Sequence, residues 1–132
     1  MINAKDITPN MNWQFLHNAA DKILVLKTDG VLDLSSANRM RTEGIELIRK
    51  NNYQCCLIDH SQAEGIKLST LEIYDLPKRY KELNVPYGFR LAVVVPDVMR
   101  VDLNFYETVC RNNGYLVSIF FDKESAIKWL KS

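Results

Sequence analysis

The stretch QCCLIDHS, residues 54–61, decides the fold of this chain. It is a short apolar run that ends in a polar cluster, and a segment with helical periodicity lies on each side of it. A run without alternation of apolar and polar side chains is typical of a strand that is buried on both faces of a parallel sheet. We therefore predict an interior strand over residues 54–59, with polar side chains where the chain leaves the sheet.

The segments before this strand predict a hairpin and a helix. Side chains alternate over residues 13–18, and the run KILVLKT over 22–28 is close enough in sequence to pair with them in the antiparallel sense. An Asp-Gly turn at 29–30 is predicted to end the second strand. A helix follows, because Asp33 or Ser35 can accept hydrogen bonds from the free amides of a first helical turn.

Beyond the central strand, the sequence predicts a loop over residues 62–68 and then a helix capped by Ser69 or Thr70. Pro77 lies within this helical segment and lacks the amide hydrogen that a continuous helix would use. The segment is therefore either one kinked helix or two pieces.

The remainder of the chain alternates strands and helices. Strands are predicted over 89–95 and 116–121, with a helix capped by Asp102 between them and a last helix capped by Asp122. Alternation of this kind is typical of parallel strands joined by right-handed helical crossovers. We predict an α/β fold with a five-stranded mixed sheet, whose first strand is antiparallel, and four helices.

Composition limits the classes of function. A chain of 132 residues predicts a single domain, with residues 1–11 as a lead-in segment. A net charge of +1 argues against a nucleic-acid partner. The sequence shows neither a signal peptide nor an apolar run of about 18 residues, so no membrane span is expected. Three cysteines, two of them adjacent, do not form a disulfide framework and indicate a cytoplasmic location.

Asp59, His60 and Ser61 form the most suggestive polar cluster, because ligands of open α/β sheets collect at the carboxyl ends of strands. A histidine beside an aspartate can act as a general base, and a serine as a nucleophile. However, neighbouring side chains of a strand point in opposite directions, and turn-forming residues are common at strand ends. We therefore expect no enzyme activity and keep the cluster as a candidate site for a ligand or partner.

Metal and cofactor sites are not predicted. The chain has two histidines and no C-x-x-C pair, so it lacks the clustered ligands that a metal site needs. Its five glycines are scattered and form no phosphate-binding loop.

Leu71 and Tyr74 form a second candidate contact site. On a helix that begins at Ser69 they lie roughly opposite the face that carries Ile73 and Leu76. In one reading both side chains are exposed on the outer face of the helix. In the other they are not an exposed pair, either because the buried face of the helix is broader or because the helix is broken at Pro77.

The order of elements resembles the STAS domain, and four segments from Asp75 onward resemble its SpoIIAA-like branch, which is also compared with CRAL-TRIO lipid-binding domains: DLPKRYKEL (75–83), FRLAVV (89–94), FYETVCRNNGYLV (105–117) and FFDKESAIKWL (120–130). In the antagonists of this family an Asp-Ser-Ser-Gly stretch opens the helix after the central strand, and a partner kinase phosphorylates one of its serines. Here residues 66–71 read IKLSTL, without the acid and the glycine. We predict that Ser69 caps the helix and is not a phosphate acceptor.

Two functions follow from these observations. The resemblance implies a non-catalytic binding or regulatory module that offers the end of the central strand and the helix from Ser69 to a protein partner, or forms a homodimer. The alternative is a small carrier of a hydrophobic or lipid-like ligand, in keeping with the aromatic content of the chain. An apolar cavity of a few hundred Å3 would favour the carrier, and a flat apolar patch would favour the module.

Overall fold

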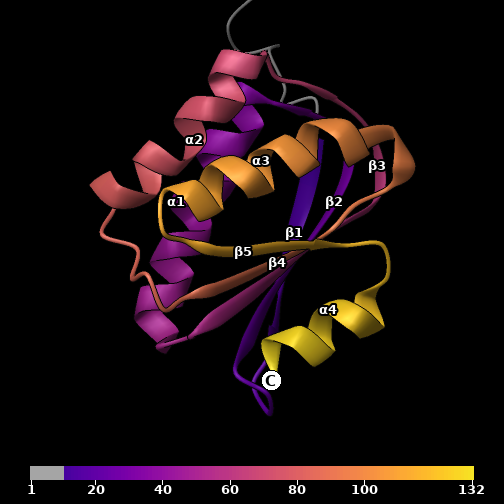
Figure 1. Ribbon diagram of the computed structural model, residues 1–132. Coiled ribbons are helices and arrows are strands. Elements are labelled where there is room, and N and C mark those ends of the chain that lie inside the picture. Colours follow the sequence, from indigo (N-terminus) through magenta and orange to yellow (C-terminus); the bar gives the residue numbers. More distant parts are fainter. Residues whose placement is uncertain (1–10) are drawn as a thin grey trace, which may run out of the picture.

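The computed structural model describes residues 11–132, in which a five-stranded sheet is covered by helices on both faces (Figure 1). The lead-in segment predicted over 1–11 lies outside the described residues except for Met11. In chain order the elements are β1 (Met11–Asn18), β2 (Ile23–Asp33), α1 (Leu34–Asn51), β3 (Cys55–Lys67), α2 (Thr70–Glu82), β4 (Arg90–Val94), the 3-10 turn η2 (Asp97–Met99), α3 (Arg100–Asn112), β5 (Leu116–Phe120) and α4 (Lys123–Leu130).

The sheet has the strand order β1-β2-β3-β4-β5, with β1 antiparallel to β2 and the other neighbours parallel. β3 is therefore the central strand of the sheet, which confirms the interior position predicted from its apolar sequence. The mixed sheet and its four α-helices confirm the predicted fold class.

Two apolar layers hold the sheet between its helices. Helices α1, α2 and α3 lie on one face, and α4 lies on the other (Figure 1). Cys55 and Leu57 of β3 pack in the layer under α4, whereas Cys56 and Ile58 point toward the three-helix side. This alternation follows from the period of a strand and explains why β3 is apolar at every position of its first half.

β2 and β3 are longer than predicted, so the turn at 29–30 and the loop over 62–68 are both wrong. The pairing continues to Asp33 of β2 and Lys67 of β3, with a shift where Lys27 pairs with Asp59 but Asp29 with Gln62. Such a shift places one extra residue on β3, as in a β-bulge. β4 pairs with β3 only as far as Asp59, so the second half of β3 has an open edge where polar side chains remain hydrated.

Helix ends follow the predicted caps with one exception. Asp33 accepts a hydrogen bond from the Ser36 amide at 2.8 Å, and Asp122 caps α4 in the same way. The exception is Asp102, which lies in the first turn of α3 because η2 leads directly into that helix at Arg100. An acidic side chain there still interacts favourably with the helix dipole.

Helix α2 is a single helix through Pro77, so the split into two pieces does not occur. Pro77 is buried together with Ile73 and Leu76, which fixes the inner face of the helix against the core. Its outer face is thereby held in one orientation.

Amide hydrogen exchange tests the placement of the central strands. We expect the amides of residues 55–58 and 91–95 to exchange among the slowest, because interior strands open only when the whole sheet unfolds. Exchange followed by NMR or mass spectrometry measures this directly. Rapid exchange across both segments would contradict the strand order.

Candidate functional site

The cluster Asp59, His60 and Ser61 lies midway along β3, where β4 ends, and not at the end of β3 as predicted. His60 is buried on the three-helix side, whereas Ser61 is exposed on the opposite face. The Asp59 carboxylate accepts a hydrogen bond from the Ser61 amide at 3.0 Å. The sequence argument that neighbouring side chains diverge is therefore confirmed, and these residues make no nucleophile–base pair.

His60 is held as a neutral imidazole. Its Nδ1 lies 2.6 Å from the Thr28 hydroxyl, and both side chains are buried. Burial lowers the pKa of His60 to about 4, and the nearby Asp59 charge opposes this shift only in part. At neutral pH the ring packs as a polar core residue.

An apolar cavity of about 170 Å3 lies between the sheet and helices α1, α2 and α3. Sequence reasoning did not predict its position. The small residues Ala37 and Gly44 on the inward face of α1 are the sequence signal for it, since both line the cavity. The sheet and the helices contribute large apolar side chains to its wall, among them Leu26, Ile58, Leu91, Met40, Ile73 and Leu103.

Few polar groups line this cavity. The hydroxyls of Tyr80 and Tyr106 are hydrogen-bonded to each other, and burial raises the pKa of both, so they remain neutral. Arg41 of α1 also lines it and donates from one terminal nitrogen to the side chain of Asn38. The Nε–H of Arg41 is buried and has no hydrogen-bond partner among the described residues.

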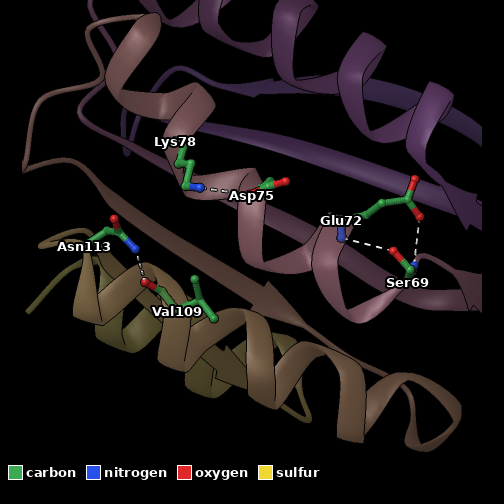
Figure 2. A network of polar contacts seen from close by, with 6 residues as sticks. All are labelled: Ser69, Glu72, Asp75, Lys78, Val109 and Asn113. Carbon is green, nitrogen blue, oxygen red and sulfur yellow. Dashed lines mark hydrogen bonds and ion pairs between the residues drawn. The ribbon is translucent and has the colours of Figure 1, made fainter.

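Ser69, Leu71 and Tyr74 lie together at the start of α2. Ser69 Oγ accepts a hydrogen bond from the Glu72 amide at 3.1 Å, and the Glu72 carboxylate accepts one from the Ser69 amide at 2.8 Å, as Figure 2 shows. This reciprocal capping box confirms that Ser69 caps the helix.

Leu71 and Tyr74 are 67% and 50% exposed, so the alternative of a broader buried face is wrong. The ammonium group of Lys78 lies 5.1 Å from the centre of the Tyr74 ring and 3.0 Å from the Asp75 carboxylate. Figure 2 shows that the Asp75–Lys78 pair follows the Ser69–Glu72 box along the same helix. The start of α2 therefore presents apolar side chains beside a small polar network.

A further exposed apolar group was missed by sequence reasoning. Val98 and Val101 are exposed around η2 and the start of α3, and Phe121 is exposed just after β5. The guanidinium of Arg100 lies 4.3 Å from the centre of the Phe121 ring, which shields one side of that ring. In the sequence prediction, Val98 and Val101 fell between the strand over 89–95 and the helix cap at Asp102, and Phe121 was the last residue of the strand over 116–121.

The three cysteines are free and buried, and their reactivity can be predicted. Burial raises the pKa of Cys110 to about 12, and it raises the pKa of Cys55 as well, so neither carries a reactive thiolate at neutral pH. We expect thiol reagents to label Cys55 and Cys110 slowly in the native protein and quickly after denaturation. Mass spectrometry of timed samples measures this, and fast native labelling of Cys110 would contradict it.

Within residues 11–132, no helix is both long and apolar enough to cross a membrane. In the same range, no group of three or more His, Cys, Asp or Glu side chains is arranged to hold a metal ion.

Comparison with known proteins finds no matching family and no matching curated protein, whereas the structure matches several solved ones. An anti-sigma factor antagonist from Mycobacterium paratuberculosis superposes with a TM-score of 0.60 at 15% identity, covering 92% of this chain and 95% of the other. An uncharacterized DUF3478-family protein with a SpoIIAA-like fold from Shewanella loihica gives 0.58 at 18% identity, covering 94% and 96%. The anti-sigma factor antagonist SpoIIAA in its unphosphorylated form gives 0.57 at 16% identity, covering 92% and 99%. The chain therefore has the SpoIIAA-like fold of the STAS domain, as its sequence resemblance implied.

Proposed function

We propose that this protein is a non-catalytic binding or regulatory module that presents the outer face of α2 to a protein partner. The observation that carries the proposal is the exposure of Leu71 and Tyr74, one helical turn apart, at the start of that helix. The solved structures described as anti-sigma factor antagonists share the fold and support a regulatory role. The proposal includes a cytosolic location, which the three free cysteines support.

The exposed pair is preorganised for binding. Ile73, Leu76 and Pro77 bury the opposite side of α2, and the capping box fixes its first turn. A rigid helix that already holds its contact side chains loses little conformational entropy when a partner binds. Leu71 and Tyr74 would bury apolar area at the centre of the contact, with Asp75 and Lys78 toward its rim.

Ser69 serves the helix in this proposal and is not a phosphate switch. Replacement by alanine removes the acceptor for the Glu72 amide, and the loss of such a cap costs roughly 0.5–2 kcal/mol. We expect Ser69→Ala to lower the melting temperature by a few degrees. Ser69→Asp should keep it near the wild-type value, since aspartate also caps helices.

Thermal unfolding followed by circular dichroism measures both variants. Equal losses in Ser69→Ala and Ser69→Asp would contradict the cap. Recovery of protein phosphorylated at Ser69 from its native cell would contradict the claim that this serine is not a switch.

Site-specific photo-crosslinking tests the proposed surface. A crosslinking amino acid placed at position 71 should capture one protein in the native cell, because that side chain would lie within the contact. The matched control is the same amino acid at position 101, since Val101 is 81% exposed but lies on α3. Equal capture from both positions, or none from position 71, would contradict the proposal.

A small carrier of a hydrophobic ligand is the second candidate function, and the cavity under α1, α2 and α3 supports it. At about 170 Å3 the cavity is smaller than the roughly 300–1,000 Å3 of drug-sized ligand pockets. It suits a small molecule better than a two-chain lipid. Small apolar molecules should therefore raise the melting temperature, and no shift with any of them would contradict this candidate.

A further inference from the structure

The size of the cavity sets the size of its ligand. An engineered apolar cavity of about 150 Å3 takes up benzene. A cavity of about 170 Å3 therefore accommodates on the order of six to eight non-hydrogen atoms. Its wall is mostly apolar side chains, so the greater part of the ligand must be hydrocarbon.

The charged residues that line the cavity indicate the sign of the charge on its ligand. The lining residues include Arg41 and Arg49 but no aspartate or glutamate. Arg49 donates a hydrogen bond to the backbone carbonyl of Leu83, and this bond connects α1 to the end of α2. Each arginine makes one such bond from a terminal nitrogen, and Arg41 differs from Arg49 in having a buried Nε–H without a partner among the described residues.

Arg41 has one buried donor without an acceptor among the described residues. One terminal nitrogen donates to Asn38, but its Nε–H is buried without a partner among residues 11–132. A buried donor without an acceptor is costly. The charges of Glu82 and Arg79 act on Arg41 in opposite directions, and neither residue lines the cavity. The other buried polar groups of the wall are already matched, since Tyr80 bonds Tyr106 and His60 bonds Thr28.

We propose that this cavity binds a small monocarboxylic acid, with a hydrocarbon tail of about six carbon atoms in the cavity and its carboxylate on the guanidinium of Arg41. A planar carboxylate fits the fork of an arginine through paired hydrogen bonds, and it would supply the acceptor that the Nε–H lacks. A single negative charge matches the single guanidinium of Arg41. The inference rests on the second candidate function, because it names the ligand class of that cavity.

A ligand series on the wild-type protein tests the charge without any substitution. Hexanoate, 1-hexanol and hexylammonium each have six carbon atoms, one of which is the carboxyl carbon in hexanoate, and they differ in the head group. Calorimetric titration near neutral pH should give hexanoate at least a tenfold lower dissociation constant than 1-hexanol, and hexylammonium the weakest binding. Tighter binding of hexyl phosphate than of hexanoate would overturn the choice of a carboxylate.

A matched pair of variants tests the residue. Arg41→Met keeps the apolar stem and removes the donors, so it should weaken hexanoate binding about ten- to hundredfold while 1-hexanol binding stays unchanged. The control is Arg39→Met on the same helix, because Arg39 is exposed, lies over the Trp13 ring and does not line the cavity. That control should leave both affinities at the wild-type value.

The outcomes distinguish failure of this inference from failure of the candidate function on which it rests, the carrier of a hydrophobic ligand. Equal binding of hexanoate and 1-hexanol, or unchanged hexanoate binding in Arg41→Met, would overturn the role of Arg41 and leave the cavity as a neutral apolar site. Failure of all the six-carbon ligands to bind would overturn both. Should Arg41→Met fail to fold, the wild-type series still decides.

Discussion

Acidification from pH 7 to pH 4 is expected to lower the free energy of unfolding by about 3 kcal/mol through His60 alone. Burial lowers the pKa of this side chain from 6.5 to about 4 in the folded state. At a pH between these two pKa values, the unfolded chain binds a proton at position 60 and the folded chain does not. Protonation therefore favours the unfolded state, and stability is lost as the pH falls through this window.

The variant His60→Gln isolates this contribution, because glutamine keeps a polar partner for Thr28 but does not titrate. Urea unfolding at a series of pH values should show a steep loss between pH 6.5 and pH 4 in the wild-type protein. The loss in His60→Gln should be shallower by about 3 kcal/mol. The same pH dependence in both proteins would show that His60 is not a buried neutral residue.

Leu57→Ala is expected to lower the free energy of unfolding by about 2–5 kcal/mol. Leu57 is fully buried in β3 and packs in the apolar layer between the sheet and α4. Its truncation removes buried hydrocarbon and leaves a cavity, because the sheet and α4 cannot fully close around it. A loss of this size is a large fraction of the stability of an ordinary domain.

Leu71→Ala is the matched control, since it makes the same chemical change on the outer face of α2. Leu71 is 67% exposed, so its truncation should change the free energy of unfolding by less than about 0.5 kcal/mol. Urea unfolding of both variants measures the difference. Similar losses in the two would contradict either the burial of β3 or the exposure of the α2 face.

The order of strands and helices along the chain, and the interior position of the strand at 54–59, were predictable from local sequence because periodicity indicates which faces of a segment are buried. The run at 54–59 lacks alternation, and it proves to be covered on both faces. The polar residues that follow were assigned to a loop. They form the second half of β3, which extends beyond the end of β4 and is hydrated along one edge. A run of polar residues indicates that a segment is exposed to solvent, and an exposed strand edge has the same polar pattern as a loop.

The helix caps were also predictable, since they depend on residues close in sequence. Ser69 and Glu72 are three residues apart and form a capping box whose pattern is visible in the chain. Asp102 was misplaced because η2 begins α3 at Arg100 without a side-chain cap. A helix that continues a 3-10 turn gives no such local signal.

The cavity was not predictable, because it depends on how far apart three helices lie on one sheet. Periodicity identifies the inward residues of α1 and α2 but does not fix the space left between them. Arg41 is similarly ambiguous in sequence, where a basic residue on a helix is ordinarily solvated. Its position in the wall, with a buried Nε–H, follows only from the packing of α1 beside Tyr80 and Tyr106.

The most direct test of the binding role of α2 is native mass spectrometry of the protein isolated from its native cell. The wild-type chain should appear at a mass above its own 15.3 kDa, as a stoichiometric complex with one other protein. Tyr74→Asp should appear as the free chain, because a charge at that position would oppose burial against a partner. Val101→Asp, which places the same charge on exposed α3 surface, should keep the complex. A wild-type chain found free, or a complex that survives Tyr74→Asp, would contradict the account.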